Sequence, residues 1–343
     1  MTESAFRIGA DAAVGGVNRA RQRRTDGVIM ELKVFSGSTH PRLANAIAAE
    51  LGISLGAVEL GRFPGGETFV KFTEHIRDAD VFIIQPTCCT PNESIMELLI
   101  MLDAARRASC GRITAVLPYF GYARQDRKDQ PRVPITAKLV ANLLVSAGAN
   151  RILTMDLHAQ QIQGFFDIPV DHLYAAPVFA AHLRQRFNRD AQIVAPDAGS
   201  GKMAHTYADM FGCGFALVAK RRVSASEVEA PYLVGDVDGR DCLLVDDLSS
   251  TAGTLVQAAL RLREAGARSV CAAVTHCCLT PVGISRLNAS IIEKVYTTDT
   301  VPIDVSACPR IEKISVAPLF ATAIQRIHQG DSISSLFLLE SGN

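Results

Sequence analysis

Short apolar runs alternate with amphipathic segments from Leu32 almost to the end of the chain. Each run has the length of a buried strand, and each segment repeats its apolar residues at the spacing of one helix face. The predicted strands are Leu32–Phe35, Val81–Gln85, Ile113–Pro118, Arg151–Asp156, Gln192–Pro196, Phe215–Lys220, Cys242–Asp246 and Ser269–His276. The predicted helices are Arg42–Leu51, Ser94–Ala108, Ile135–Ala147, Ala176–Phe187, Lys202–Met210, Leu255–Ala265 and Ala317–Ile327. This alternation predicts an α/β fold with mainly parallel sheets.

The chain length predicts two domains, because 343 residues exceed the size at which a single core usually stops growing. We place the boundary near Ala175, giving domains over 30–175 and 176–316, and the last helix, in 317–343, packs on either half. Residues 1–29 differ in composition and carry an arginine cluster. They lack the apolar region of a signal peptide, so we expect a disordered extension.

The amino-acid composition limits the kinds of partner that the protein is expected to bind. The 35 basic and 35 acidic side chains cancel, which argues against a nucleic-acid or membrane-surface binder. The longest apolar stretches are of strand length, too short to cross a bilayer. The nine cysteines show neither zinc-site spacing nor a disulfide framework, so we expect reduced thiols in the cytoplasm.

A polar segment lies between the strand predicted at Cys242–Asp246 and the helix predicted from Leu255. Its carboxylates, Asp246 and Asp247, are followed by hydroxyl and small residues: Ser249, Ser250, Thr251, Ala252, Gly253 and Thr254. Hydroxyls and the backbone N–H groups of a helix N-terminus bind phosphate. Carboxylates repel phosphate and suit the vicinal hydroxyls of a ribose, or a cation. The segment predicts a sugar-phosphate site, and the alternative is a strand whose polar residues only cap a helix.

Basic side chains lie in two further loops. The segment 118–132, PYFGYARQDRKDQPR, places Arg124 and Gln125 just beyond a predicted strand, where a guanidinium can clamp a phosphate. Lys220 and Arg222 lie where another strand enters an aperiodic segment, and a mobile loop there could close over a phosphate in transfer. The alternatives are a solvated loop and an ordinary basic strand end.

Two more motifs suggest an adenine site and a metal site. In RFPGGETF, over 62–69, a tight turn lets Phe63 stack on a purine and Glu67 accept from its amino group; the alternative is a hairpin turn with Phe63 in the core. His158 and Asp197 each follow a strand, in different halves of the chain, and could hold Mg²⁺ in a water-rich shell. The alternative for His158 is a structural role.

Taken together, these motifs closely resemble the ribose-phosphate pyrophosphokinase family from about Leu32 to Phe337. The sequences YARQDRK and MDLHAQQIQGFF are highly specific to that family. The Asp-Asp loop also occurs in type I phosphoribosyltransferases, whose single domain leaves the motifs of the first half unexplained. The resemblance implies two similar phosphoribosyltransferase-type (Rossmann-like) domains, the first binding ATP and the second ribose 5-phosphate. It also implies Mg²⁺ and a homo-oligomer, expected to be a hexamer.

The implied reaction transfers the β,γ-diphosphoryl group of ATP to the C1 hydroxyl of ribose 5-phosphate, giving phosphoribosyl diphosphate and AMP. The implied ATP-binding residues are Phe63, Gly65, Gly66, Glu67, Arg124 and Gln125. Those for ribose 5-phosphate are Arg222, Asp246, Asp247, Ser250, Thr251, Ala252, Gly253 and Thr254. Lys220 and Arg222 match the catalytic cations, and His158 and Asp197 match the metal positions.

This sequence departs from the family pattern at three positions. Gly65 replaces an Asp that contacts ATP, Ser250 replaces an Asp found in many members, and Met203 replaces a common Arg. These departures leave a catalytically silent regulatory subunit as an alternative. The retained His158, Lys220 and Arg222 argue against it.

Overall fold

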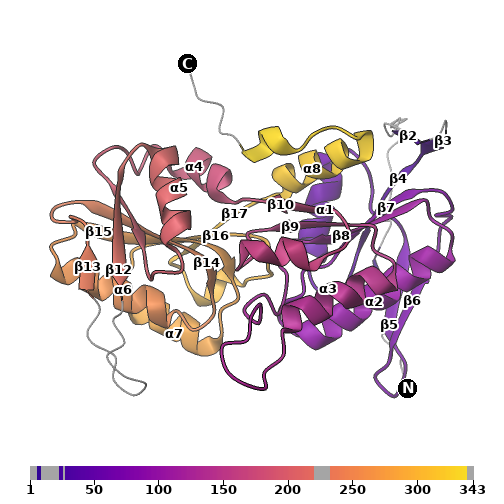
Figure 1. Cartoon of the computed structure of the whole chain (residues 1–343), viewed down its shortest axis with the longest axis horizontal. Coiled ribbons are helices and arrows are strands. Elements are labelled where there is room, and N and C mark those ends of the chain that lie inside the picture. The colour runs from indigo at the N-terminus through magenta and orange to yellow at the C-terminus, as the bar shows by residue number, and fades with distance from the viewer. Residues whose placement is uncertain (1–5, 9–22, 26–27, 220–231, 338–343) are drawn as a thin grey trace. The chain divides into compact units, whose positions relative to one another are not determined.

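The computed structural model describes residues 6–8, 23–25, 28–219 and 232–337. They form two compact units, one running to Leu173 and taking in the helix Ala317–Gln329, the other spanning Tyr174 to Val316. Each unit is an α/β structure with a mainly parallel sheet, so the predicted fold class is confirmed (Figure 1).

The first unit contains a five-stranded parallel sheet in the order β10-β9-β8-β7-β4. Its strands are β4 (Leu32–Ser36), β7 (Asp80–Ile84), β8 (Arg112–Leu117), β9 (Arg151–Met155) and β10 (Val170–Leu173). Helices α1 (Pro41–Glu50) and α8 (Ala317–Gln329) cover one face, and α2 (Pro91–Arg107) and α3 (Thr136–Ala147) cover the other (Figure 1). Because helices cover both faces, the central strands are mostly apolar.

Smaller elements complete this unit. Strands β5 (Val58–Arg62) and β6 (Thr68–Phe72) form a hairpin, and β1 (Phe6–Ile8) pairs with β5. Strands β2 (Arg23–Thr25) and β3 (Val28–Met30) pair with each other, and 3-10 turns span Gln160–Phe165 and Ser334–Phe337. Three short strands therefore lie within the first 30 residues, where we expected a disordered extension.

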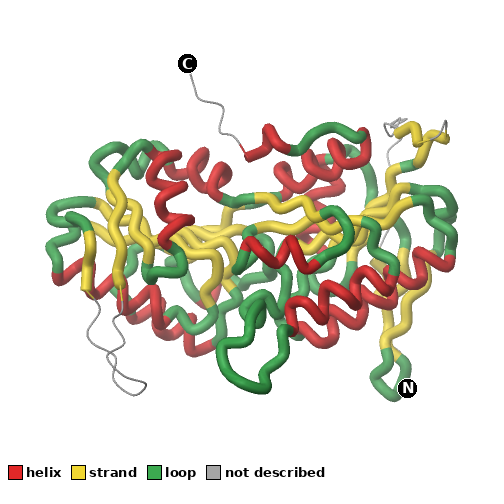
Figure 2. Tube along the Cα trace, in the orientation of Figure 1, coloured by secondary structure: helices red, strands yellow, loops and turns green. Residues whose placement is uncertain are grey.

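The second unit contains a seven-stranded sheet in the order β13-β12-β11-β14-β15-β16-β17, in which only the β12–β13 pair is antiparallel. Its strands are β11 (Gln192–Ala195), β12 (Gly214–Ala219), β13 (Tyr232–Val234), β14 (Asp241–Ser249), β15 (Ser269–Cys277), β16 (Val295–Thr298) and β17 (Ile311–Ile314). Its helices are α4 (Ala176–Leu183), α5 (Gly201–Phe211), α6 (Gly253–Glu264) and α7 (Pro281–Ala289), and a 3-10 turn spans Val305–Ala307. Helices α4 and α5 cover one face, and α6 and α7 the other (Figure 2).

Every predicted strand and helix has a counterpart, with small shifts at the ends. The largest shift along a strand is in β14, which continues past Asp246 to Ser249 because it stays paired with β15 as far as Cys277. The sequence prediction missed β1, β2, β3, β5, β6, β10, β13, β16, β17 and α7. Within 28–219 and 232–337, no helix is long and apolar enough to cross a membrane.

Candidate functional site

In the first unit, the loops after β7, β8 and β9 leave the same edge of the sheet, because these three neighbouring strands are parallel. The loop after β8 is long (Figure 2). It carries Arg124 and Gln125, both exposed. Gln125 accepts hydrogen bonds at its side chain from Thr136 and, at 3.2 Å, at its carbonyl oxygen from the Ala137 N–H. The first turn of α3 therefore fixes the backbone beside the exposed guanidinium.

The loop after β7 lies against the loop after β8. The Gly121 N–H donates to the Thr87 hydroxyl at 2.6 Å, and the Thr87 N–H donates to the Tyr119 carbonyl at 3.0 Å. Tyr122 donates its hydroxyl proton to Asn92 at the start of α2. Gly121 is required here because a Cβ atom would overlap the Thr87 carbonyl oxygen.

His158 follows β9 and is exposed. The preceding turn is sharp, with Asp156 at a φ of 37°, a region that residues other than glycine rarely adopt. The Leu157 N–H donates to Nε2 of His172 at 2.9 Å, which fixes the chain next to His158. Gln161 then donates to Asp126 at 3.0 Å. The structure thus brings the His158 segment and the Arg124 loop together.

The RFPGGETF motif forms the turn of the β5–β6 hairpin, closed by the Phe63 N–H donating to Glu67 O and the Gly66 N–H donating to Phe63 O, both at 2.8 Å. Gly66 has a φ of 89°, a conformation that favours glycine. Phe63 is 52% exposed, so the alternative with Phe63 in the core is wrong. Gly65 and Glu67 are also exposed, and the turn offers an aromatic face and a carboxylate to solvent.

In the second unit, Asp197 follows β11 and Asp246 lies within the neighbouring strand β14, and Ser200 contacts both side chains. The Ser200 hydroxyl lies 2.8 Å from Oδ1 of Asp246 and 3.4 Å from Oδ1 of Asp197. That oxygen of Asp197 also accepts from the Gly199 N–H at 2.9 Å. Ser200 lies in the PDAGSGK motif, but the sequence prediction did not single it out.

Burial, together with the nearby charges of Asp247 and Asp197, raises the pKa of Asp246 to about 7. Carboxylates so placed repel an anion and can accept hydrogen bonds from hydroxyl groups.

The segment after β14 leads into α6. Ser249, expected as a loop hydroxyl, is a buried strand residue, because β14 extends to it; as a loop donor it was predicted wrongly. Ala252 is buried and has a φ of 55° at the N-cap of α6, where its side chain offers no hydrogen bond to the helix. The first N–H groups of α6 therefore have no side-chain cap from the N-cap residue, and Ser250, Thr251, Gly253 and Thr254 lie around them.

The turn between β15 and α7, together with α7 itself, orients the carbonyl groups of Ser250 and Thr251. The Thr280 N–H donates to the Ser250 carbonyl at 2.9 Å, and Arg286 donates to the Thr251 carbonyl at 3.2 Å. In a planar trans peptide the next N–H points the opposite way from the carbonyl, so the N–H groups of Thr251 and Ala252 point away from α7. Gly283 is required because a Cβ atom would overlap the Ser250 carbonyl oxygen. The sequence prediction missed these residues.

Lys220 and Arg222 lie outside the described residues. The chain leaves the described part at Ala219 and returns at Tyr232, and these two residues are paired across β12 and β13. Ala219 ends β12, a direct neighbour of β11 in the sheet.

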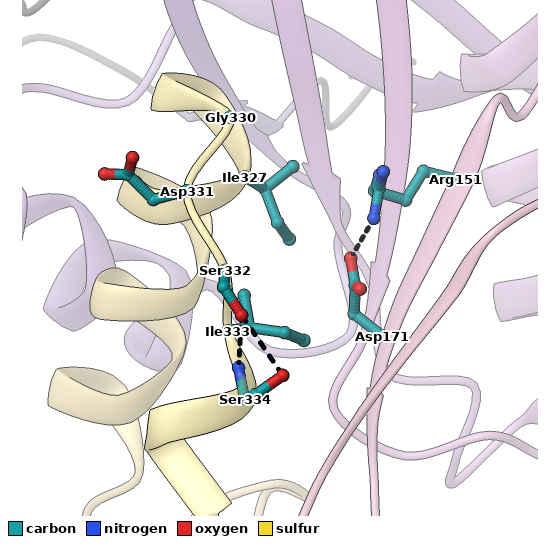
Figure 3. Close-up of a pocket in the computed structure, with 8 residues that line it drawn as sticks. All are labelled: Arg151, Asp171, Ile327, Gly330, Asp331, Ser332, Ile333 and Ser334. Carbon is teal, nitrogen blue, oxygen red and sulfur yellow. Dashed lines mark hydrogen bonds and ion pairs between the residues drawn. The ribbon is translucent and has the colours of Figure 1, made fainter.

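In the parts of the chain that the structure describes, no group of three or more His, Cys, Asp or Glu side chains could hold a metal ion. His158 belongs to the first unit and Asp197 to the second. A pocket of about 290 Å³ lies elsewhere in the first unit, between α8, the residues after it, and the Arg151–Asp171 ion pair of 2.6 Å (Figure 3). Arg151 begins β9, so this pocket lies at the opposite edge of the sheet from the loops above.

Comparisons with known proteins agree with these observations. The model for the N-terminal domain of ribose phosphate pyrophosphokinase matches residues 32–148, and that for the phosphoribosyl synthetase-associated domain matches 222–338. The ribose-phosphate pyrophosphokinase of Chlorobaculum tepidum is 51% identical over 307 residues, covering 89% of this chain and 95% of that protein. The one from Helicobacter pylori is 48% identical over 305 residues, covering 89% and 96%.

Among solved structures, the phosphoribosylpyrophosphate synthetase from Mycobacterium smegmatis matches with a TM-score of 0.82 and 41% identity. The match covers 86% of this chain and 98% of that one. The two family models and these relatives together span both units. The chain therefore belongs to the ribose-phosphate pyrophosphokinase family.

Proposed function

We propose that the protein transfers the β,γ-diphosphoryl group of ATP to the C1 hydroxyl of ribose 5-phosphate, producing phosphoribosyl diphosphate and AMP. The observation that carries this proposal is the β14–α6 segment. It places two carboxylates, Asp246 and Asp247, ahead of a helix N-terminus whose N-cap, Ala252, leaves the N–H groups open to a ligand. The carboxylates accept from the ribose hydroxyls, and the segment Ser250–Thr254 binds the 5-phosphate.

The first unit supplies the ATP site in this proposal. The exposed ring of Phe63 stacks against the adenine, and the turn residues Gly65, Gly66 and Glu67 lie beside it. Arg124 and Gln125, on the loop after β8, bind the phosphates, and a guanidinium suits that role. The site needs no covalent intermediate, because positioning and charge neutralisation supply most of the acceleration in phosphoryl transfer.

We propose Mg²⁺ as the cofactor, with His158 and Asp197 as its protein ligands. What supports a cation beside Asp197 is the neighbouring Asp246, whose pKa is raised by burial and by the charges of Asp247 and Asp197. Mg²⁺ would neutralise charge on the diphosphoryl oxygens and keep several waters. The protein's own contribution is to orient both carboxylates, which Ser200 does through its hydroxyl group.

Replacing His158 by alanine is expected to raise the Mg²⁺ concentration needed for half-maximal activity several-fold, because one ligand is lost. The melting temperature in the absence of metal should not change, since His158 is exposed. The measurement is a Mg²⁺ titration of the initial rate, with His205→Ala, an exposed histidine of α5, as control. An unchanged titration would assign His158 a structural role.

Replacing Ser250 by alanine is expected to weaken ribose 5-phosphate binding by about 0.5–1.5 kcal/mol, and by up to about 3 if the hydroxyl meets charged oxygens. A serine hydroxyl donates directly to a phosphate, so its presence in place of Asp is compatible with catalysis. The measurement is the Michaelis constant for each substrate, with Ser285→Ala, an exposed serine of α7, as control. A change for ATP alone would mean that the substrates are assigned to the wrong loops.

The direct test of the proposed function is AMP release from ATP by the full-length protein. We expect AMP only when ribose 5-phosphate and Mg²⁺ are both present. The catalytically silent subunit is not favoured, because the relatives that match most of the chain are themselves named as pyrophosphokinases. Absence of AMP under all conditions would instead favour the catalytically silent subunit.

We further propose a cytoplasmic homo-oligomer, with a hexamer expected from the family. None of the nine cysteines, which all lie in the described residues, forms a disulfide, as expected in a reducing compartment. Met96, Leu139 and Leu143 expose 53%, 54% and 41% of their surface on the paired helices α2 and α3, and exposed apolar groups of this kind suit a subunit contact. Sedimentation analysis of the purified protein measures the assembly.

A further inference from the structure

Two adjacent cysteines, Cys88 and Cys89, lie between the end of β7 and the start of α2. Their sulfur atoms are 3.7 Å apart. Cys88 is buried, at 3% exposure, whereas Cys89 is open to solvent. A reagent that reaches Cys89 therefore meets a second thiol directly behind it.

The Cys89 thiol is also more acidic than an ordinary cysteine thiol. The hydrogen bond with Cys88 lowers the pKa of Cys89 to about 7, and the nearby N-terminus of α2 favours a thiolate as well. Five other cysteines are less acidic, because burial raises their pKa: Cys110, Cys213, Cys242, Cys271 and Cys277. Thiolate reactivity and exposure therefore coincide at Cys89.

We propose that Cys89 is a peroxide-reactive thiol and that Cys88 resolves its oxidation into a reversible disulfide between the two. The Cys89 thiolate attacks one oxygen of hydrogen peroxide, breaks the O–O bond and becomes a sulfenic acid, and the other oxygen leaves as water after protonation. The Cys88 sulfur then attacks the sulfenic sulfur, and a second water leaves. The two thiols lose two electrons, which reduce one peroxide molecule to two waters.

The backbone makes this disulfide easy to reduce. Consecutive Cα atoms are about 3.8 Å apart, below the roughly 4.4 Å at which disulfides usually begin, so the bond is strained and labile. Cys89 already has a φ of 61°, a conformation that non-glycine residues seldom adopt. Drawing the two sulfur atoms into bonding distance must move the backbone of both residues.

That backbone movement would affect the loop after β8 directly, because neighbouring residues contact this loop. Cys88 and Cys89 lie between two of its contacts, the Thr87 bonds to Tyr119 and Gly121 on one side and the Asn92 bond to Tyr122 on the other. The same loop carries Arg124 and Gln125. Oxidation is therefore expected to displace the residues that bind ATP, a consequence that rests on the proposed function.

The test oxidises the reduced full-length protein with a few equivalents of hydrogen peroxide, blocks the remaining thiols and maps the cysteines by mass spectrometry. Trypsin releases Asp78–Arg106, which contains no cysteine besides Cys88 and Cys89. We expect this peptide to lose about 2 Da, because two hydrogens leave, and dithiothreitol to restore it. This result does not depend on enzymatic activity, so it separates the thiol chemistry from the proposed function.

Two variants sharpen the test. Cys89→Ser should abolish the mass loss, whereas Cys88→Ser should let Cys89 gain oxygen atoms without forming a disulfide; Cys110→Ser is the control and should behave as the wild type. In the wild type, oxidation should raise the Michaelis constant for ATP about threefold to tenfold, the loss expected from one displaced hydrogen bond. The constant for ribose 5-phosphate should stay unchanged. A peptide that remains reduced while other cysteines react would overturn the proposal, and a disulfide without effect on ATP would overturn its link to the loop.

Discussion

Alanine in place of Lys220 is expected to lower kcat by about 10²-fold or more, while both Michaelis constants change little. The transferring diphosphoryl group is densely anionic, and a cation that meets it mainly in the transition state accelerates the step without tightening substrate binding. Lys220 directly follows β12, whose neighbour β11 leads to Asp197. Arg222→Ala is expected to reduce kcat in the same manner.

The measurement is a full set of initial rates over both substrates for each variant. Lys313→Ala removes an exposed lysine from β17 of the same unit and serves as the matched control. A Lys220→Ala enzyme with nearly normal kcat would remove Lys220 from the catalytic residues. A large rise in one Michaelis constant at constant kcat would assign it to ground-state binding instead.

The sequence predicted the core strands well because helices cover both faces of each parallel sheet. Every residue of β7 is buried, and after Asp80 its apolar run is unbroken. Strand β6 is different, since it is partly exposed along its length and includes Thr68 and Lys71. Strand β16 has the opposite difficulty: Thr297 and Thr298 are buried, and Thr298 donates to the Thr275 carbonyl at 2.7 Å. Buried threonines whose hydroxyls are hydrogen-bonded interrupt the apolar run, so the hydrophobic pattern did not predict this core strand.

The sequence also named candidate site residues, but it did not reveal what positions them. Ser200 joins Asp197 to Asp246 because β11 and β14 are neighbours, although they are far apart in the chain. The turn at Thr280 had a usable signal, since a threonine followed by proline is typical of a helix start. No local pattern indicates that this turn contacts Ser250. Contacts of this kind depend on strand order, which spacing alone does not determine.

Gly283→Ala and Gly121→Ala are expected to affect different substrates. A methyl group at Gly283 would overlap the Ser250 carbonyl, so the phosphate-binding segment must shift. A methyl group at Gly121 would overlap the Thr87 carbonyl, so the loop carrying Arg124 must shift. Overpacking of this kind costs about 1–3 kcal/mol, which corresponds to about fivefold to 150-fold in binding.

We therefore expect Gly283→Ala to raise the Michaelis constant for ribose 5-phosphate and Gly121→Ala to raise that for ATP, each with little effect on the other substrate. Each variant is a control for the other, because both add one methyl group next to a backbone carbonyl. Gly164→Ala, where a Cβ atom would meet nothing within 4 Å, controls for the substitution itself. Equal changes in both constants would indicate general destabilisation, which the melting temperatures would reveal. A reversed pattern would show that the two loops bind the opposite substrates, since each methyl group displaces a loop within its own unit.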